Sequence, residues 1–389
     1  DADYLRNVKS NSHRVLLEDL PTPSLLLDLD ILESNIQFMQ DRADTLGVHM
    51  RPHVKTHKCI EIGELQRSAG ATGITVATIE EAFTFANAGF DDILWAFPMI
   101  PSRLNDVLQL SRQIEFGVTV ESEATLELLS TTGEALSVWI EIDCGYGRSG
   151  VPHESEILVR LAQKIIAAGL TLKGCFTHGG HTYKAEDSRQ IIELAEDGRC
   201  AMVSVGDRLR SAGIDPGLLS VGSTPEMSIV ENLEGIDEAR PGNYSLFDYS
   251  QIHLGSCRVE RCAATVLSTV VSTNETRAKS IADCGALVLS KDLGPDTPPH
   301  YGRVFEDLSG ERLHPDIHVS SVSQEHGTLT TNYPVGTKIR ILPNHSCLTV
   351  AQFDHFQVTR GNEVLDRWQI RRSRDLEAAG TSKFPRTNE

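Results

Sequence analysis

The sequence predicts an α/β protein: a (β/α)8 TIM-type barrel followed by a C-terminal, mostly antiparallel β domain. From about residue 22 to residue 240, short apolar runs alternate with longer segments whose apolar residues recur at helical spacing. This alternation is expected when parallel strands are each followed by a covering helix. After about residue 258, β-rich segments separated by turns replace the alternation. That change indicates antiparallel sheet.

The strand–helix units can be followed in order along the chain. The first is an apolar run at 23–29 (PSLLLDL) followed by a helical segment at 31–47, where Gly47 is suited to end the helix. The later strands are predicted within residues 74–78, 92–97, 138–143, 174–180 and 218–225. Polar side chains follow several of these strands, and a (β/α)8 barrel gathers its catalytic groups at that face. The barrel is therefore favoured over an open doubly wound sheet.

The change of pattern also sets the expected domain boundaries. A chain of 389 residues is too long for one small core. We expect the barrel over residues 22–257 and the β domain over residues 258–375. Residues 1–21 are candidates for pairing with the β domain, and residues 376–389 are expected to form a solvated tail.

Composition excludes several classes of partner. The chain has 36 Lys and Arg against 54 Asp and Glu, a net charge of -18, which opposes general binding to nucleic acid or to anionic membranes. No run of apolar residues approaches the ~20 that a membrane span requires. The eight cysteines show no framework spacing, so we expect reduced thiols and a cytoplasmic location.

The segment RPHVKTHKC, residues 51–59, is a basic exception in this acidic chain. Its Lys55 is flanked by His53 and His57 and by further cationic side chains. Neighbouring like charges and desolvation both lower the pKa of an ammonium group, and a neutral amine attacks carbonyl carbons. Taken alone, however, the segment is better explained as a solvated basic loop.

A second motif favours a nucleophilic Lys55 over a solvated basic loop. In SVGSTP, an apolar run leads into Gly222, Ser223 and Thr224, whose backbone N–H and hydroxyl groups are suited to hold a phosphate monoester. A phosphate cradle and an activated lysine at one face of a barrel together suggest pyridoxal phosphate, whose aldehyde and phosphate they would bind.

Two weaker signals accompany these motifs. Arg148 lies in a glycine-rich loop, EIDCGYGRSGV, where it would keep a facing pyridine nitrogen unprotonated or simply bind loop carbonyl groups. His345 and Cys347 stand two apart in ILPNHSC, at the end of a predicted strand, so both side chains are expected on one side. Imidazole and thiolate suit zinc or another borderline metal, although a single His-x-Cys pair is a weak signal.

In combination, these blocks resemble the fold type III pyridoxal phosphate enzymes related to alanine racemase. The resemblance is to the metal-activated group of D-serine dehydratase and D-threonine aldolase. It spans roughly residues 20–370 and rests on TPSLLLDLD, RPHVKTHK, GITVATIEEA, GFDDIL, EIDCGYGRSGV, SVGSTP, RPGNYSLFDYSQIHLGSC, QEHGTL and LPNHSC, in that order.

The resemblance implies a role for particular residues. The family's catalytic positions fall on Lys55, as the Schiff-base lysine, and on His53 and Tyr183. Its cofactor-binding positions match Lys55, Arg148, Tyr183, Gly222, Ser223, Thr224, Asn243 and Tyr244. Its paired metal ligands match His345 and Cys347, with Zn2+ favoured and Mn2+ or Mg2+ as alternatives.

The implied function is a pyridoxal phosphate- and metal-dependent lyase acting on D-3-hydroxy amino acids. Dehydration of D-serine or D-threo-3-hydroxyaspartate is favoured, because the family's dehydratases carry His-x-Cys where its aldolases carry His followed by Asp. D-Threonine aldolase or D-3-hydroxyaspartate aldolase activity is the alternative. A racemase, which has no use for the metal pair, and a non-catalytic cofactor carrier, which lacks the β domain, are remote alternatives. The family also implies a homodimer.

Overall fold

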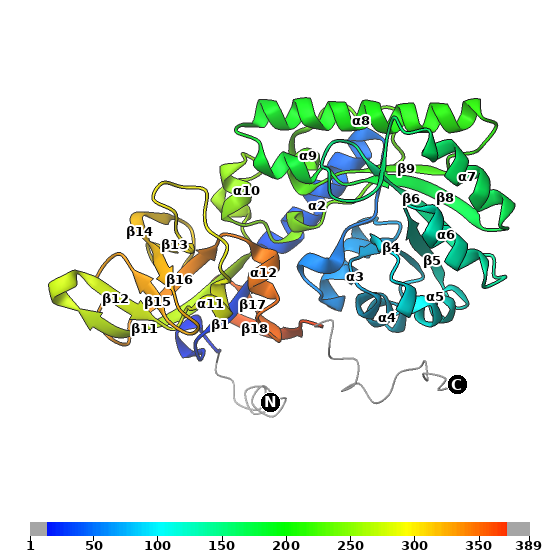
Figure 1. Cartoon of the computed structure of the whole chain (residues 1–389). Coiled ribbons are helices and arrows are strands. Elements are labelled where there is room, and N and C mark those ends of the chain that lie inside the picture. The colour runs from blue at the N-terminus through cyan, green and yellow to red at the C-terminus, as the bar shows by residue number, and fades with distance from the viewer. Residues whose placement is uncertain (1–13, 372–389) are drawn as a thin grey trace. The chain divides into compact units, whose positions relative to one another are not determined.

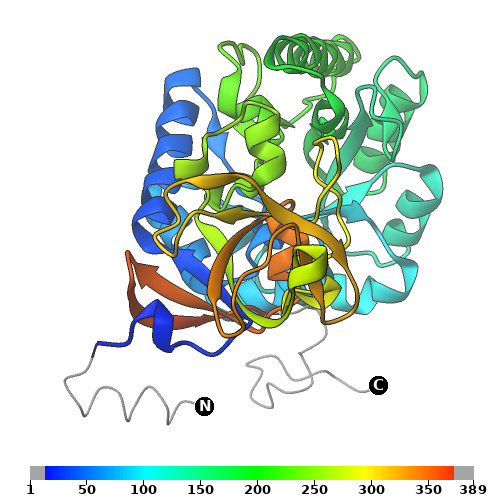
Figure 2. The same ribbon diagram turned by 90° about the vertical axis from the view of Figure 1, so that its left-hand side faces the viewer.

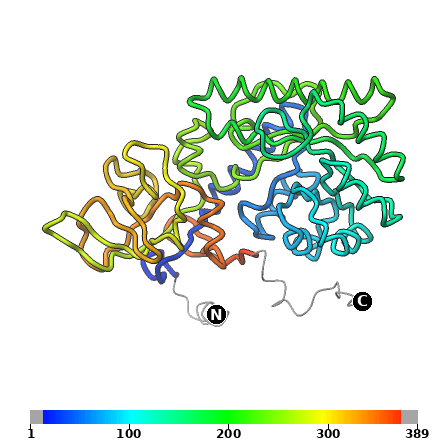
Figure 3. Tube along the Cα trace, viewed as in Figure 1, coloured from blue at the N-terminus to red at the C-terminus, as the bar shows by residue number. Residues whose placement is uncertain are grey.

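The computed structural model describes residues 14–371. Two compact units make up this part of the chain (Figures 1 and 3). One unit consists of Ile36–Tyr244 with Arg371, and the other consists of the chain up to Asn35 together with Ser245–Ile370. Among residues 14–371, none of the helices combines the length and the apolar content that a bilayer span requires.

The first unit is built on eight parallel strands, which confirms the predicted barrel. Their order is β2 (His49–Met50), β10 (Glu238–Ala239), β9 (Leu218–Val221), β8 (Thr171–Thr177), β6 (Ser137–Asp143), β5 (Glu115–Val120), β4 (Asp92–Pro98) and β3 (Ile74–Val76). The backbone N–H groups of Thr72 and Thr75 donate to the carbonyl groups of Met50 and Pro52, at 2.9 and 2.8 Å. These bonds join β3 to the chain that follows β2 and close the ring.

Helices follow most of the barrel strands. They are α3 (Ile60–Ala69), α4 (Ile79–Asn87), α5 (Leu104–Ser111), α6 (Glu123–Ser130), α7 (Ile157–Ala167), α8 (Ser188–Ser211) and α9 (Thr224–Ile229). A further helix, α2 (Leu29–Leu46), precedes β2. Several start at a side-chain cap: Thr78 accepts the Glu81 N–H at 3.2 Å, and Ser122 accepts the Thr125 N–H at 3.3 Å. These caps satisfy N–H groups that a helix start leaves without partners. They explain why the strands pass into helices at these residues.

The barrel interior contains a buried ion pair beside its apolar core. The Arg51 guanidinium lies 2.7 Å from Glu238 and 2.6 Å from Asp92. Burial lowers the pKa of Arg51, but the two carboxylates outweigh burial and raise it. Because Arg51 is held inside the barrel, its charge supports the fold and lies outside the basic cluster that the sequence suggested.

The second unit is a closed antiparallel barrel with an extension, and Figure 2 shows it facing the reader. The ring runs through β11 (Ala264–Asn274), β12 (Lys279–Ala282), β15 (Gly327–Leu329), β14 (Leu313–Val322), β13 (Gly302–Phe305) and β16 (Lys338–Pro343), and returns to β11. The extension beside β11 is formed by β1 (Ser24–Asp28), β17 (His355–Arg360) and β18 (Glu363–Gln369). Short helices α10 (Tyr249–His253), α11 (Ala286–Leu289) and α12 (Ser346–Val350) complete it. The mostly antiparallel β domain is thereby confirmed.

The strand β1 departs from the sequence prediction, which placed it first in the parallel barrel. It pairs antiparallel with β11 and parallel with β17. Leu25, Leu26 and Leu27 are all buried, so the run lacks the alternation that would assign it to one kind of sheet. The unit boundaries at Asn35 and Ser245 accordingly differ from the expected boundaries at residues 22 and 257.

The described part of the N-terminal segment pairs with β18. Val15 accepts the Val364 N–H at 2.9 Å, and the Leu17 N–H donates to the Asn362 carbonyl at 3.0 Å. Residues 1–13 of the predicted pairing segment, and the predicted tail at residues 376–389, lie outside the described residues.

Candidate functional site

Lys55 lies in the short 3-10 turn η2 (Val54–Thr56), just beyond the end of β2. Its backbone N–H donates to His53 Nδ1 at 3.4 Å. The neighbouring Lys58 has a different environment, because its ammonium group lies 3.3 Å from Glu81, whose carboxylate is almost fully buried. The structure therefore gives the two lysines distinct surroundings, with Lys58 in a buried ion pair.

Two imidazoles near Lys55 are held neutral. Burial, and then the charge of Lys55, lower the pKa of His53 and of His178 well below the usual value. Arg240 lowers both, and Arg148 also lowers that of His178. These residues follow four different barrel strands, yet they lie close enough to affect each other electrostatically. The result is a cationic cluster with two neutral imidazoles, an environment that attracts an anion.

Arg148 lies in the loop after β6, which is hydrogen-bonded to Asp143. The Asp143 carboxylate accepts the N–H groups of two loop glycines, at 2.9 and 3.0 Å. The Arg148 guanidinium lies 5.3 Å from the centre of the Tyr146 ring and 3.8 Å from the buried Glu141. Its side chain is half exposed. The cation is thus available at the loop surface.

The predicted phosphate cradle lies directly after β9. Gly222 has a φ of +108°, a conformation that favours glycine. Ser223 and Thr224 are buried; the Ser223 hydroxyl lies 3.1 Å from that of Thr182, and the Thr224 hydroxyl oxygen accepts the Tyr244 N–H at 3.1 Å. Two hydroxyl groups beside a glycine turn can donate to a phosphate, so these residues fit that group.

The segment that follows β10 connects the cradle to the lysine turn. The His53 N–H donates to the Pro241 carbonyl at 3.0 Å, and a Cβ on Gly242 would lie 2.8 Å from the His53 carbonyl oxygen. A few residues later, the Tyr244 N–H reaches Thr224. The chain near Lys55 and the glycine–serine–threonine turn are therefore held together by one short stretch of backbone.

The other predicted pocket residues have different surroundings. Asn243 is buried at the start of η5 (Asn243–Ser245). Tyr244 is also buried, and its hydroxyl accepts a hydrogen bond from Gln66 at 3.0 Å; burial raises its pKa. Tyr183, in η4 (Gly180–Lys184), is 40% exposed. Tyr244 thus supports the cradle through its backbone, with its hydroxyl occupied by Gln66.

The predicted metal pair lies in the second unit. His345 precedes α12, and its Nδ1 lies 2.7 Å from the Asp292 carboxylate. Cys347 is hydrogen-bonded to the same imidazole. Burial lowers the pKa of His345, but Cys347, Asp248 and Asp292 together raise it to about 10. A concentration of negative charge around an imidazole is the environment that a bound cation would neutralise.

The donor set fits a borderline divalent metal. A carboxylate on one ring nitrogen of a histidine fixes the tautomer and leaves the other nitrogen for an ion, and Asp292 is placed to do this for His345. Asp248 steadies the same turn, because its carboxylate accepts the Ser346 N–H at 2.9 Å. Within residues 14–371, no group of three or more His, Cys, Asp or Glu residues is arranged as a metal site, so the pair supplies two ligands.

Three residues at these sites were not predicted: Arg240, Glu226 and Asp292. For Glu226 a signal was present, because Ser223-x-x-Glu226 is a capping-box pattern. Asp292 and its partner His345 are 53 positions apart, and no local pattern links them. Arg240 begins the quoted block RPGNYSLFDYSQIHLGSC but was given no role, and its contact with Ser220, 20 positions away, was not predicted.

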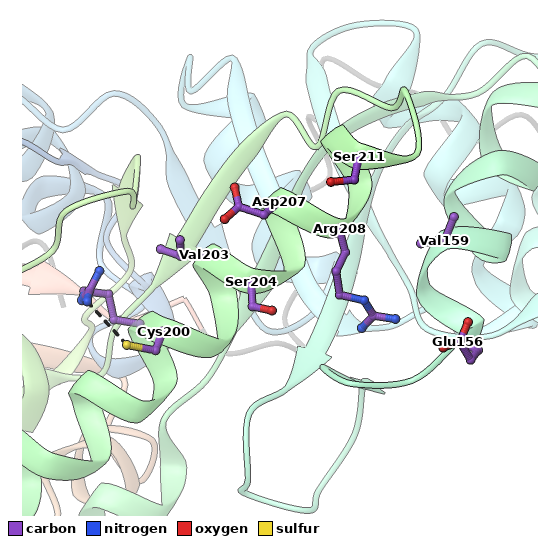
Figure 4. Close-up of a pocket in the computed structure, with 9 residues that line it drawn as sticks. Glu156, Val159, Cys200, Val203, Ser204, Asp207, Arg208 and Ser211 are labelled. Carbon is purple, nitrogen blue, oxygen red and sulfur yellow. Dashed lines mark hydrogen bonds between the residues drawn. The ribbon is translucent and has the colours of Figure 1, made fainter.

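A separate hollow of about 580 Å³ lies between α7 and α8 (Figure 4). It is lined by Glu156, Val159, Arg199, Cys200, Val203, Ser204, Asp207, Arg208 and Ser211. None of the predicted site residues is among them. The Arg208 guanidinium is engaged by the backbone carbonyl groups of His153 and Ser155.

Comparison with known proteins identifies the family. Residues 27–250 match the family described as "Alanine racemase, N-terminal domain". The chain belongs to this family. Residues 263–359 match a second family, "Putative serine dehydratase domain". The resemblance predicted from the sequence motifs is confirmed.

Several named proteins are similar to this chain. D-threo-3-hydroxyaspartate dehydratase of Delftia sp. (strain HT23) is 38% identical, over 90% of this chain and 97% of that protein. D-serine dehydratase of Dictyostelium discoideum is 32% identical, over 91% and 97%. 3-hydroxy-D-aspartate aldolase of Paracoccus denitrificans (strain Pd 1222) is 29% identical, over 90% and 92%. The likeness therefore extends along most of the chain.

Solved structures of similar proteins show the same likeness along most of the chain. The structure of the Delftia sp. HT23 dehydratase has a TM-score of 0.88 and 37% identity, covering 92% of this chain and 99% of that one. A cysteine-to-alanine mutant of a D-threo-3-hydroxyaspartate dehydratase, described as the metal-free form, has a TM-score of 0.89 and 36% identity, covering 92% of this chain and 100% of that one. Alanine racemase of Bacillus anthracis has a TM-score of 0.66 and 14% identity, covering 90% of this chain and 98% of that one. This last likeness shows the shared fold alone.

Proposed function

We propose that this chain is a pyridoxal phosphate- and divalent metal-dependent dehydratase of D-3-hydroxy amino acids. It would convert D-serine or D-threo-3-hydroxyaspartate into a 2-oxo acid and ammonia. The observation that carries the proposal is that one chain has both sets of groups: Lys55 in a cationic cluster with neutral imidazoles, and His345 with Cys347 beside Asp292. The names of the similar dehydratases support the same reaction.

The residues of the barrel unit provide for the cofactor. When bound, pyridoxal phosphate supplies an electron sink for charge at the substrate's Cα, and the metal supplies a Lewis acid for the β-hydroxyl group. Ser223 and Thr224 would hold the phosphate through their hydroxyl groups, and Arg148 would face the pyridine nitrogen. Lys55 Nζ would attach the cofactor and, as a general base, take the α-proton. His53, kept neutral by burial and by Lys55, adds no positive charge beside that amine.

The metal would be held by His345 Nε2 and Cys347 Sγ. We favour Zn2+, because imidazole and thiolate suit a borderline ion, whereas Mg2+ and Mn2+ prefer oxygen ligands. Asp292 would keep the His345 ring in the tautomer that leaves Nε2 available.

A product assay tests the proposal. Purified protein with pyridoxal phosphate and Zn2+ or Mn2+ is given D-serine, D-threonine and D-threo-3-hydroxyaspartate, and 2-oxo acid, ammonia, glycine and aldehyde are followed. We expect 2-oxo acid and ammonia, lost on chelation and restored by metal. Absence of product from every D-3-hydroxy amino acid would contradict the proposal.

Aldol cleavage is the second candidate, because a 3-hydroxy-D-aspartate aldolase is 29% identical over 90% of this chain. The same groups could serve it, since both reactions begin with a 3-hydroxy amino acid bound through its amine. Glycine and an aldehyde in the product assay, without ammonia, would assign the chain to that reaction.

We further propose a cytoplasmic homodimer. All eight cysteines are free thiols, which supports a reducing compartment, and the dimer is expected from the family. Light scattering of the purified protein, with a mass of twice 42.7 kDa as the expected result, checks the dimer.

A further inference from the structure

Glu226 joins two turns that carry predicted cofactor-binding residues. Its carboxylate Oε2 accepts the Ser223 N–H at 2.8 Å, while the Ser223 hydroxyl lies 3.5 Å from the Glu226 N–H. The other carboxylate oxygen, Oε1, lies against Gly179, and a Cβ on that glycine would overlap it. Glu226 therefore contacts both the turn after β9 and the turn after β8.

The two turns are also joined by hydroxyl groups. Thr182 donates to the Gly179 carbonyl at 2.6 Å, and its oxygen lies 3.1 Å from the Ser223 hydroxyl. A small enclosed space of about 20 Å³, lined partly by Gly179, Gly222 and Glu226, lies behind this junction. Glu226 is buried and lines this enclosed space.

We propose that Glu226 is a positioning residue that fixes Ser223 and the turn after β8 for the phosphate group of the cofactor. The inference rests on the proposed function, because it assumes that Ser223 and Thr224 hold that phosphate. Since Glu226 accepts the Ser223 N–H, that N–H is not available to the phosphate, which the hydroxyl groups of Ser223 and Thr224 would bind. Glu226 touches neither the cofactor's ring nor the substrate in this assignment, and it acts through Ser223.

The charge of Glu226 makes the proposal testable by pH. Burial raises the pKa of this carboxyl to about 7, against the lowering effects of Ser223 and Arg240. The other titratable groups that line the same enclosed space are Cys144, after β6, His181, in η4, and Arg199, in α8. A phosphate dianion nearby disfavours the carboxylate form further. Cofactor binding should therefore be accompanied by proton uptake at Glu226, and affinity should fall as pH rises through about 7.

The experiment measures cofactor affinity rather than turnover. Holoprotein is dialysed to equilibrium against graded pyridoxal phosphate, or against pyridoxal, which lacks the phosphate, and bound cofactor is measured by absorbance. We expect Glu226→Ala to lower the affinity for pyridoxal phosphate by about tenfold, because a buried N–H loses its partner. The affinity for pyridoxal should stay almost unchanged. Glu226→Gln, which keeps an acceptor oxygen, should restore affinity and remove the pH dependence relative to the wild type.

Ser122→Ala provides the matched control. It removes a helix cap from α6 in the same unit, so it should lower stability without changing the ratio of the two affinities. The proposal would be overturned if Glu226→Ala lowered the affinities for pyridoxal phosphate and pyridoxal equally. It would also be overturned if the affinity of Glu226→Gln for pyridoxal phosphate depended on pH as that of the wild type does. If Glu226→Ala does not fold, the Glu226→Gln comparison decides alone. A wild-type protein that binds no pyridoxal phosphate would instead overturn the proposed function.

Discussion

At the scale of the residue, the structure distinguishes two lysines that are three positions apart. Lys58 is paired with the buried Glu81. Lys55 lowers the pKa of His53 more than Lys58 does, and it also lowers that of His178. The first expected outcome concerns Lys55→Ala. The variant should lose the covalently attached cofactor and about 1,000-fold of its activity, because both nucleophile and base are removed. Borohydride reduction followed by mass spectrometry measures the attachment.

Lys58→Ala is the contrasting variant. It should keep the cofactor but lose about 3 kcal/mol of stability, because the Glu81 carboxylate remains buried without its cation. Urea unfolding measures that loss. Cofactor attached in Lys55→Ala and absent in Lys58→Ala would reverse the assignment.

Asp292 carries the second prediction. Asp292→Ala should weaken metal binding by roughly 10- to 100-fold, since the partner that orients His345 is lost. Metal content after dialysis against graded Zn2+ reports the change. Asp307→Ala, which removes a carboxylate that binds Ser309 in the same unit, should leave the affinity unchanged. An Asp292→Ala protein with wild-type metal content would show that His345 needs no such partner.

Individual residues also show what the sequence could predict. Lys55, Ser223, Thr224, His345 and Cys347 stand in short motifs whose chemistry is local, so they could be proposed from spacing and resemblance. The positions of Arg240 and Asp292 depend on contacts across 20 and 53 positions. Such contacts exist only after the strands have assembled, so the block that begins at Arg240 does not reveal its partner.

At the scale of the element, β1 shows that the sequence pattern can predict a strand without predicting the sheet that it joins. The strand itself was predicted at 23–29 and lies at Ser24–Asp28. The sheet to which β1 belongs was not predicted correctly, because three successive buried leucines fit a strand of a parallel barrel and a central strand of a mixed sheet equally well. The pairing with β11 is fixed by residues 264–267, more than 230 positions away. Element type was readable from the sequence, but the partner was decided by tertiary packing.

The third prediction tests the role of β1 in its unit. Leu26 is fully buried and packs with Leu17, Leu20 and Leu267. Leu26→Ala should cost about 2–5 kcal/mol, since it leaves a cavity in a close-packed core. Leu365→Ala, on the outer strand β18, removes the same atoms from a side chain that is 39% exposed, and it should cost far less. Urea unfolding of both variants compares them, and equal losses would contradict the central position of β1.

At the scale of the whole molecule, stability should depend on pH through buried imidazoles. Burial, before other causes, lowers the pKa of His57 to about 3 and that of His53 well below the usual 6.5. In the unfolded chain each would bind a proton below about 6.5, so the stability they provide is present above that pH and is lost progressively as pH falls toward 3. Glu226 acts in the opposite sense: its raised pKa, about 7, provides stability that is lost as pH rises from about 4.5 to 7.

Because these contributions oppose each other, a single variant must isolate one of them. His57→Asn keeps an acceptor for the Cys59 N–H, which His57 Nδ1 accepts at 3.1 Å, but cannot be protonated. Between pH 7.5 and pH 5, the wild type should lose about 2 kcal/mol more stability than His57→Asn, the value expected for one imidazole kept neutral 1.5 pH units below its unfolded pKa. Urea unfolding at both pH values measures the difference. An equal loss in the two proteins would mean that His57 is protonated within the fold at pH 5, and therefore that water reaches this part of the barrel unit.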